Sequence, residues 1–405
     1  MRVVFLSDDF PPTSFGGAGI STYELALGVK KAGHEVSVIT TCRSEQDAGK
    51  MEYHSITVFK IVSAYHARWR SWISIHNPAV VRQVENLLRQ LAPDVVHLNN
   101  VHQYLSYSCL KIAKRHAKVV VWTARDGMAV SYGKIATARY LRNLDPHLTW
   151  LDNLRQAGKR YNPLRNFFIR RYLGYVDQKL AVSDALVAVL ARNGVKGVET
   201  LHTGIDVGAW HVSSAQVSEF KKRNGLESKK IILFGGRLGA GVQVVRAMRL
   251  VAGLVPDAVL VVMGREEDAG TMKEVGADLP LVYTGWISGE EKITAYYASD
   301  LVWAPSPYFD SFPRSTLEAS ASGKPVIATK FGGASELVVH GKTGYVVDPL
   351  NPQEIADRSV ELLQNKQKAD AFGKAGRERV EAEFNLSSKV DELVATYRAL
   401  VAKNS

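Results

Sequence analysis

The chain alternates short apolar runs with segments whose apolar residues recur at helical spacing. Runs such as VVFLS near the start, DVVHL from Asp94 and KVVVW from Lys118 are almost continuously apolar. Such runs are typical of parallel strands that are covered on both faces. Between them the spacing is helical, as in the segment that begins near Ile20 and continues through Leu25 and Val29. This alternation predicts parallel sheets joined by right-handed helical crossovers.

The strand pattern starts again past the middle of the chain, so we expect two domains of the α/β class. The later runs are IILFGG, AVLVVMG, LVYTG, DLVWAPS, PVIAT and GYVVD. A chain of 405 residues is also too long for a single core. Loop residues gather near 203–210 and mark the domain change. We expect doubly wound domains over 1–205 and 206–384, and an amphipathic helix in the terminal segment 385–405.

Positive charge is concentrated in one segment. The chain has a formal net charge of +11, and Val101–Tyr175 alone holds 14 Lys and Arg against three acids. A basic segment with interleaved aromatic residues is compatible with contact with an anionic membrane surface, where each cation contributes about 1 kcal/mol, or with nucleic acid. An ordinary solvated surface is the alternative, because the arginines of the helix expected after Pro163 do not share one face. Those arginines are Arg165, Arg170 and Arg171, and the aromatic residues are Trp150, Tyr161, Phe167, Phe168 and Tyr172.

Composition favours a protein of the cytoplasm. Only two cysteines occur, Cys42 and Cys109, which is too few for a disulfide framework. The first residues, MRVVFLSDD, have acids too early for a signal peptide, and no apolar run approaches the length of about twenty residues that spans a membrane. Binding of nucleic acid through the basic segment would give a steep salt dependence, and we expect no such partner.

Residues 308–336 carry the strongest chemical signal. Asp310 precedes a helix that is expected to begin at Pro313 and to end at Gly323, and Glu318 lies inside that helix. The free N–H groups of a helix start attract phosphate, while a carboxylate accepts hydrogen bonds from a diol. The spacing therefore suits a nucleoside diphosphate sugar, which has hydroxyl groups at both ends. The alternative is a solvated Asp and a surface Glu on an ordinary helix–strand unit.

Two other loops follow strand ends, where ligands of parallel sheets bind. The loop FPPTSFGGAG carries Gly16 and Gly17, which allow close approach of the backbone to a ligand. It lacks the third glycine of a dinucleotide fingerprint, and no acid ends the second strand. The loop FGGRLGAG carries Gly236 and Arg237. A cation after a buried strand is costly unless it meets an anion, which is either a phosphate or a nearby carboxylate.

The pair Asp310 and Glu318, followed by SGKPVIAT and GGASE, resembles the E-x7-E signature of the retaining GT-B glycosyltransferases of family 4. Asp310 replaces the first Glu of that signature. The opening PP…GG, then ELA, GHEV, LAVSDAL and LHTGID, extend the resemblance over nearly the whole chain. It implies a GT-B fold, with two Rossmann-like domains facing each other across a cleft. The first would bind the acceptor, the second would bind the donor, and the last helix would cross back to the first domain.

The resemblance also implies roles for individual residues. Val242 stands where the family usually has a Lys, with Arg314 and Lys330 as candidate substitutes, and Arg125 stands where a His is common. The implied catalytic residues are Arg237, Asp310 and Glu318, with Arg237 on the donor diphosphate. The implied donor-binding residues are Gly16, Gly17, Gly236, Arg265, Ser311, Phe312, Arg314 and Ser315. The acceptor-side residues are His97, His102, Arg125 and Asp126, where a structural role is the alternative for the two histidines.

The implied activity is transfer of a hexose, with retention, from a nucleoside diphosphate sugar to a hydroxyl of a glycan or lipid-linked intermediate of cell-surface polysaccharide. The departing phosphate would take the acceptor's proton, and we expect no metal or other cofactor. The expected location is the cytoplasm, and membrane contact through residues 101–175 would place the protein at the inner face of the plasma membrane. One alternative is a nucleotide-sugar-binding protein with little turnover, which Val242 and Asp310 favour. Another is a nucleotide-sugar epimerase or phosphorylase of the same architecture.

Overall fold

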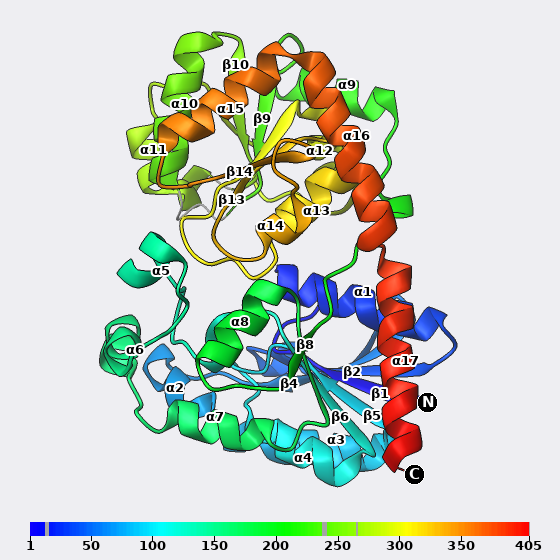
Figure 1. Cartoon of the computed structure of the whole chain (residues 1–405). Helices are drawn as coiled ribbons and strands as arrows, with labels where there is room; N and C mark the ends of the chain where they lie inside the picture. The colour runs from blue at the N-terminus through cyan, green and yellow to red at the C-terminus, as the bar shows by residue number, and fades with distance from the viewer. Residues whose placement is uncertain (13–15, 237–240, 265, 405) are drawn as a thin grey trace. The chain divides into compact units, whose positions relative to one another are not determined.

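The computed structural model describes residues 1–12, 16–236, 241–264 and 266–404. The chain divides into two compact units, Met1–Gly204 with Leu386–Ser405, and Ile205–Asn385. Each unit consists of one sheet with helices packed against it (Figure 1). The predicted fold class, α/β with two Rossmann-like domains, is therefore confirmed.

The first unit is built on an eight-stranded sheet in the order β3-β4-β2-β1-β5-β6-β7-β8. Neighbouring strands are parallel except for the β3–β4 pair at one edge. The order reverses between β1 and β5, which makes the ends of these two strands the switch point of the unit. The strands are β1 (Arg2–Leu6), β2 (Glu35–Cys42), β3 (Gly49–Tyr53), β4 (Ile56–Val62), β5 (Val95–Leu98), β6 (Val119–Ala124), β7 (Gln178–Ala181) and β8 (Val198–Thr200).

Local sequence signals start several of the helices in this unit. Pro78 opens α3, and the side chains of Thr149 and Asp152 form a capping box at the start of α6. Short 3₁₀ turns lie at Glu45–Asp47, Ala67–Trp69 (η2), Gly127–Ala129 (η3) and Gly158–Arg160 (η4). The helices are α1 (Gly17–Lys31), α2 (Arg70–Ile73), α3 (Pro78–Leu91), α4 (Ser108–His116), α5 (Ala138–Asn143), α6 (Trp150–Ala157), α7 (Arg165–Leu173), α8 (Asp184–Arg192) and α17 (Leu386–Asn404).

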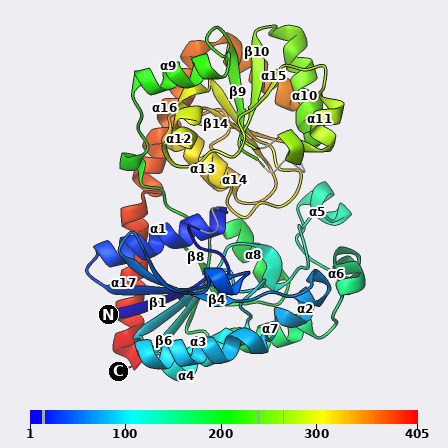
Figure 2. The same cartoon turned by 180° about the vertical axis from the view of Figure 1, so that it is seen from behind.

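The last helix, α17, belongs to the first unit, as the resemblance implied. It lies beside α1 in both views (Figures 1 and 2). The helices come close because Gly28 of α1 has no side chain: a Cβ at that position would lie 2.4 Å from Cγ2 of Val390. The apolar residues that α17 adds to the core of the unit are Val390, Leu393, Val394 and Tyr397.

The second unit is built on a six-stranded, fully parallel sheet in the order β11-β10-β9-β12-β13-β14. Its strands are β9 (Lys230–Phe234), β10 (Ala258–Val262), β11 (Leu281–Tyr283), β12 (Leu301–Ala304), β13 (Val326–Thr329) and β14 (Gly344–Val347). Its helices are α9 (Ser214–Arg223), α10 (Gly241–Leu254), α11 (Thr271–Val275), α12 (Gly289–Ala298), α13 (Arg314–Ala321), α14 (Ala334–Leu337), α15 (Pro352–Gln364) and α16 (Lys366–Glu383), and 3₁₀ turns lie at Val207–Ala209 and Glu266–Ala269.

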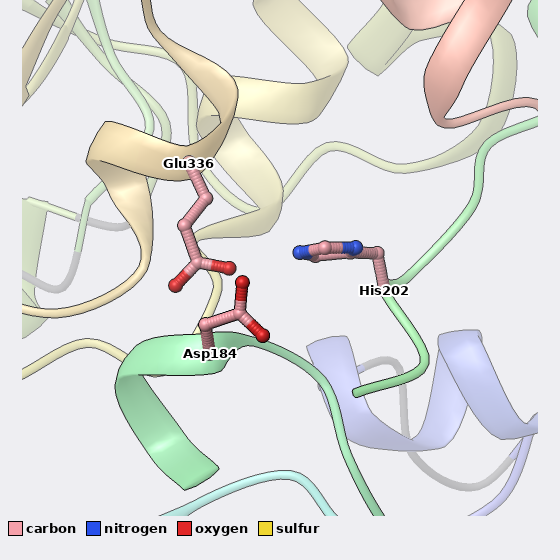
Figure 3. A group of neighbouring side chains, drawn as sticks. All are labelled: Asp184, His202 and Glu336. Atoms are coloured by element: carbon pink, nitrogen blue, oxygen red, sulfur yellow. The ribbon is translucent and has the colours of Figure 1, made fainter. Parts of the chain in front are cut away.

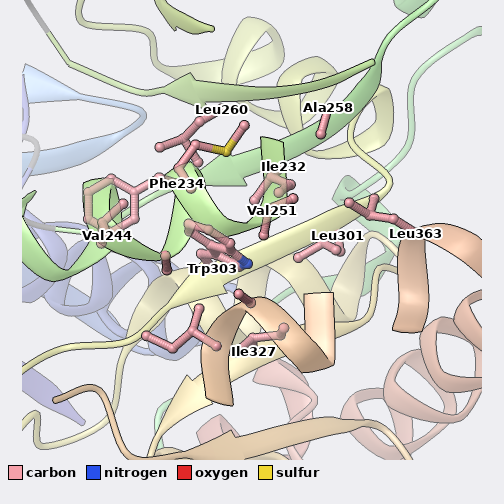
Figure 4. Close-up of a cluster of buried hydrophobic side chains, with 14 of the residues drawn as sticks. Ile232, Phe234, Val244, Val251, Ala258, Leu260, Leu301, Trp303, Ile327 and Leu363 are labelled. Carbon is pink, nitrogen blue, oxygen red and sulfur yellow. The ribbon is translucent and has the colours of Figure 1, made fainter. Parts of the chain in front are cut away.

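The core of the second unit is centred on Trp303 of β12 (Figure 4). The indole is fully buried beside Phe234 and Ile327 of the neighbouring strands β9 and β13. Its N–H group donates to the hydroxyl of Ser359 on α15 at 2.8 Å, so the one polar atom of this side chain is satisfied. This packing fixes β9, β12 and β13, the strands whose following loops carry the candidate donor residues.

Two local features differ from the sequence expectation. The hairpin of β3 and β4 was not predicted, because its turn uses His54 and Ser55 at positive φ, where Asn-Gly or Asp-Gly is usual. Pro313 caps α13 as the residue before the helix and is not its first residue. The expected stop at Gly323 agrees with its φ of 66°, a conformation that favours glycine.

None of the described helices has the length and apolar character needed to cross a membrane.

Candidate functional site

The switch point of the second sheet lies between β9 and β12, and the candidate donor residues follow these two strands. A Cβ on Gly235, just after β9, would lie 3.2 Å from Cβ of Ser315 and 3.0 Å from the hydroxyl of Tyr296. It would also lie 2.8 Å from Cε of Met263, which follows β10. Glycine at this position therefore lets the end of β9, with Gly236, lie directly against the start of α13.

A second close approach holds the loop that contains Asp310. The carbonyl of Asp310 accepts from the N–H of Gly333 at 2.9 Å, and its N–H donates to the carbonyl of Phe331 at 3.3 Å. Gly332, at φ 92°, lies so close that a Cβ there would be 1.9 Å from the carbonyl oxygen of Asp310. The GGASE motif thus acts through its backbone: it fixes the position of Asp310 in front of α13.

The carboxylate of Glu318 is held by three side chains inside the second unit. Its Oε1 accepts from Nζ of Lys292 at 2.6 Å and from Nε of Arg314 at 2.8 Å. Its Oε2 accepts from the hydroxyl of Tyr296 at 3.0 Å. A carboxylate has about four acceptor positions, so these three bonds leave about one for a further donor. Glu318 is therefore neither a solvated surface residue nor fully saturated by its neighbours.

The same neighbours determine the charge of Glu318. Burial raises the pKa of its carboxyl group, but Lys292 and Arg314 lower it by more, so the pKa lies below its ordinary value. The hydroxyl of Tyr296 is held protonated, because burial and the adjacent carboxylate both raise its pKa. The site therefore contains a buried, ionised carboxylate with a net cationic surrounding.

The start of α13 has backbone N–H groups without an intrahelical acceptor. The first intrahelical bonds of α13 are made by the N–H groups of Thr316 and Leu317, both to the carbonyl of Pro313. The N–H groups of Arg314 and Ser315 precede them, in the part of a helix that has no intrahelical acceptor. Ser311 and Phe312 are buried immediately before the cap. The arrangement suits an anion at this helix start.

Some of the expected cations lie elsewhere or outside the described residues. Arg237 and Arg265 are not among the residues that the structure describes. Val242 lies in the first turn of α10. Lys330 forms an ion pair with Asp348 at 2.7 Å after β13, and β12 separates that strand from β9. Because Arg314 is bonded to Glu318, neither suggested substitute for the family lysine is an isolated cation.

In the first unit, His102 lies at the switch point between β1 and β5. Asp8, after β1, accepts from the backbone N–H groups of Gln103, Tyr104 and Leu105 at 2.6–2.8 Å and so fixes the loop that follows His102. Burial raises the pKa of Asp8, against the lowering effect of His102 and of these bonds. The ring of His102 lies 3.6 Å from Oδ2 of Asp126, which follows β6. His102 and Asp126 are thus brought together, as a candidate acceptor site requires.

His97 has the structural role that was left open as the alternative. The side chain is fully buried on β5, and its Nδ1 and Nε2 lie 2.5 Å from the Tyr397 hydroxyl and 2.7 Å from Oγ1 of Thr123. Burial, with a smaller contribution from Arg125, lowers the pKa of His97 to about 3. Both ring nitrogens are used within the unit, so His97 joins α17 to the sheet.

Other candidate residues of the first unit lie at the ends of its strands and helices. Arg125 donates from Nε to Oδ1 of Asn99 at 3.0 Å, which links the ends of β6 and β5. Gly16 is the N-cap of α1, and Gly17 is its first residue.

Three further polar side chains near helix starts and loops were not among the expected site residues. Asp184 opens α8 and accepts a hydrogen bond from the hydroxyl of Thr200, and His202 lies on the segment after β8 (Figure 3). Glu336, drawn in the same figure, lies on α14 of the second unit.

Sequence reasoning missed Lys292, Tyr296 and Asp8. Lys292 and Tyr296 are four residues apart on α12, which places both on one face of that helix. That spacing was the available signal for a pair that binds a single carboxylate. Asp8 directly follows a buried strand, and an acid in that position usually bonds to backbone N–H groups or to a ligand.

Two family models together cover most of the chain. The model described as Glycosyltransferase Family 4 matches residues 15–208, and the model described as Glycosyl transferases group 1 matches residues 216–379. The first lies within the first unit except for its last residues, and the second lies within the second unit.

One curated relative and two solved structures that cover nearly the whole chain indicate what it is similar to. The chain is 27% identical to a GDP-mannose-dependent alpha-mannosyltransferase of Mycolicibacterium smegmatis, over 100% of this chain and 99% of that protein. Its fold is similar to that of the sucrose-phosphate synthase of Thermosynechococcus elongatus, with a TM-score of 0.78, 20% identity and 99% of each chain covered. It is also similar to Anabaena HepE in complex with UDP-glucose, with a TM-score of 0.71, 18% identity, and 98% and 100% of the chains covered.

Proposed function

Because the chain belongs to the family 4 glycosyltransferases (glycosyl transferases group 1) and has their GT-B fold, we propose that it transfers a hexose from a nucleoside diphosphate sugar to a hydroxyl acceptor with retention at the anomeric carbon. The observation that carries this proposal is the ionised carboxylate of Glu318, held beside the start of α13 at the switch point of the second unit. One nucleoside diphosphate sugar could place its diphosphate at the helix start and donate a hydrogen bond from a hydroxyl group to Glu318.

In this proposal the second unit binds the donor. The N–H groups at the start of α13 and Arg237 stabilise the diphosphate as it departs, because donors already in position stabilise developing charge most effectively. Asp310 accepts from hydroxyl groups at one end of the donor, and Glu318 accepts at the other. The acceptor oxygen forms its new bond to the anomeric carbon on the face that the phosphate leaves. The departing phosphate oxygen takes the acceptor's proton, so the reaction balances without a metal or other cofactor.

GDP-mannose is the donor that we propose to test first, since the full-length mycobacterial relative is named for it. The test is thermal stabilisation of the protein by GDP-mannose, UDP-glucose and dTDP-glucose at equal concentration. We expect one donor to raise Tm in a saturable way, and we expect Glu318→Gln to remove that shift. The matched control is Glu291→Gln, which changes an exposed carboxylate of α12. A donor shift that survives in Glu318→Gln would remove this residue from the donor site.

Turnover separates the enzyme from the alternative of a binding protein with the same fold. We expect Arg237→Ala to reduce the rate of transfer at least tenfold while Tm of the free protein stays unchanged. Without an acceptor, the rate of donor hydrolysis is measured instead, and the same reduction is expected. A retained α-anomeric signal in the ¹H NMR spectrum of the product would support retention. Tight binding of a donor without transfer or hydrolysis would favour the binding protein instead.

The first unit presents a surface that suits an anionic membrane, from which a lipid-linked acceptor would be taken. Trp72 of α2, Trp150 of α6 and Phe167 of α7 are 53%, 68% and 56% exposed. These three helices lie next to one another in both views (Figures 1 and 2). Arg170 and Arg171 of α7 are also exposed, which adds cations to the aromatic surface. Exposed aromatic and basic side chains together are typical of an interface with anionic lipid.

Co-sedimentation with vesicles tests the membrane proposal. We expect the protein to pellet with vesicles of phosphatidylglycerol and not with vesicles of phosphatidylcholine, and we expect the double variant Trp150→Ser and Phe167→Ser to stay in solution. Leu254→Ser is the control, because Leu254 of α10 is 57% exposed in the second unit. Equal pelleting with both lipids would contradict the charge argument.

A further inference from the structure

A basic recess in the first unit is not explained by the fold. It is a shallow recess, open to solvent, that is lined by side chains from α2, η4, α6 and α7 and by the loops after β5 and β6. The lining contains three arginines, one histidine and no carboxylate. The lining residues are Arg70, Ser71, Ser74, His102, Met128, Tyr132, Ala157, Arg160 and Arg165.

Arg165 lines the recess and is 2% exposed. It donates to Oγ of Ser74, to the carbonyls of Met128 and Ser131, and to Oδ1 of Asn166. All four acceptors are neutral, and no described carboxylate accepts from Arg165. A guanidinium group has five N–H groups, so about one remains for a ligand. A buried cation without an anionic partner is costly, which is consistent with the lowering of the pKa of Arg165 by burial.

The other two arginines are available for a ligand. Nε of Arg70 is buried without a hydrogen-bond partner among the described residues. The side chain of Arg160, on η4, makes no ion pair or hydrogen bond within the described part of the chain. The neighbouring His102 lies 3.6 Å from Oδ2 of Asp126, and the charge of this single carboxylate also raises the pKa of Arg165. Arg70, Arg160 and Arg165 thus leave a positive charge that an external anion would neutralise.

We propose that this recess binds the phosphate group of the acceptor substrate. Guanidinium groups match a phosphate because their parallel N–H groups donate to two of its oxygens at once. The hydroxyl of Ser71, which is buried in the same wall, adds a neutral donor. His102, one of the acceptor-side residues expected from the sequence, lines the same recess. The phosphate site therefore deepens the proposed function, and the identification of its ligand as the acceptor rests on that function.

The phosphate has two possible sources, a lipid headgroup or a soluble phosphorylated sugar. Trp69 and Trp72 flank Arg70 in the chain and are about half exposed, which would place a lipid headgroup in the recess when these rings contact a membrane. A soluble sugar phosphate would need the arginines but not the tryptophans. The shared chemistry is a phosphate ester, and the two sources differ in their dependence on vesicles.

Binding is tested first in the absence of donor. The full chain is titrated with methyl phosphate in 150 mM NaCl by isothermal calorimetry, with the wild type compared to Arg70→Gln and Arg160→Gln. These positions are chosen over Arg165, whose replacement would break four hydrogen bonds. The control is Arg68→Gln, because Arg68 is exposed beside Trp69 and does not line the recess. We expect saturable binding that weakens at least tenfold in either test variant and less than twofold in the control.

The source is then identified by flotation with phosphatidylglycerol vesicles. A lipid headgroup is supported if Arg70→Gln and Arg160→Gln no longer float with the vesicles. Added methyl phosphate should then also release the wild-type protein from the vesicles. Unchanged flotation together with weakened methyl phosphate binding supports a soluble phosphorylated acceptor. The proposal is overturned if methyl phosphate does not bind in a saturable way, or if Arg68→Gln weakens it as much as the test variants. Because no nucleotide is present, failure of donor binding would leave this result unaffected.

Discussion

A buried carboxylate is stable only where cations and hydrogen-bond donors replace the water that it has lost. For Glu318 these are Lys292, Arg314 and Tyr296, all within the second unit. The sequence spacing of Asp310 and Glu318 indicated a carboxylate near a helix start, and that part could be predicted. The partners on α12 could not, because nothing in the local sequence says which helix will pack against α13.

We expect Glu318→Gln to lower the free energy of unfolding by about 3 kcal/mol at pH 7, because it leaves Lys292 and Arg314 without their buried counter-charge. The pKa of Glu318 is lowered in the folded protein, so its stabilising effect is complete above the ordinary value of 4.5 and is lost as the pH falls through the folded value. The difference in free energy of unfolding between the wild type and Glu318→Gln should therefore become smaller below pH 4.5. Urea denaturation of both proteins at pH 7 and pH 4 measures this difference. An equal difference at the two pH values would contradict this account.

His97 provides a second pH test at the residue scale. Its folded pKa of about 3 lies below the ordinary value of 6.5, so the unfolded chain binds the extra proton as the pH falls. The protein should therefore lose about 2 kcal/mol of stability between pH 7 and pH 5 through this one group. In His97→Gln that part of the pH dependence should disappear. His211 is exposed, so His211→Gln should keep this pH dependence. If the wild type, His97→Gln and His211→Gln all show the same pH dependence, His97 is not its source.

At the scale of elements, glycines set the distances between the segments that form the donor site. Periodicity in the sequence predicted the parallel strands well, because apolar runs record burial on both faces. It did not show that Gly332 allows backbone-to-backbone contact with Asp310, since the missing Cβ matters only once the two loops are placed together. The β3–β4 hairpin escaped prediction for a related reason: its turn at His54 and Ser55 lacks the usual residues.

Gly332→Ala tests this contact against a matched control. Gly332 and Gly341 both have positive φ, at 92° and 74°, but a Cβ on Gly341 would meet nothing within 4 Å. Gly341→Ala should therefore cost about 1 kcal/mol from backbone strain alone. Gly332→Ala should cost about 2 kcal/mol more, because the loop must move away from Asp310. It should also weaken the stabilisation by donor, which Gly341→Ala should leave unchanged; thermal shifts with and without GDP-mannose measure both.

At the scale of the whole molecule, the first unit is made of two parts of the chain that are far apart in sequence. The amphipathic pattern of the last helix could be read from the sequence, and the family resemblance indicated where it packs. The bond between His97 and Tyr397, 300 residues apart, could not be foreseen from either. Four buried side chains of α17 complete the core of this unit, and burying each contributes about 1.5–3 kcal/mol. Their sum is comparable with the whole stability of a domain, about 5–15 kcal/mol.

This comparison predicts that residues 1–204 do not fold without α17. A chain of residues 1–204 joined to 386–404 by a short Gly-Ser linker should fold cooperatively, as seen by near-UV circular dichroism and hydrogen exchange. The linker can be short because Ile205 forms a β-bridge with Asn385, and its N–H donates to the carbonyl of Phe384 at 2.9 Å. Residues 1–204 alone, or the linked chain with Leu393→Asp, should lack that cooperativity. If residues 1–204 alone unfold as cooperatively as the linked chain, α17 adds nothing essential to this core.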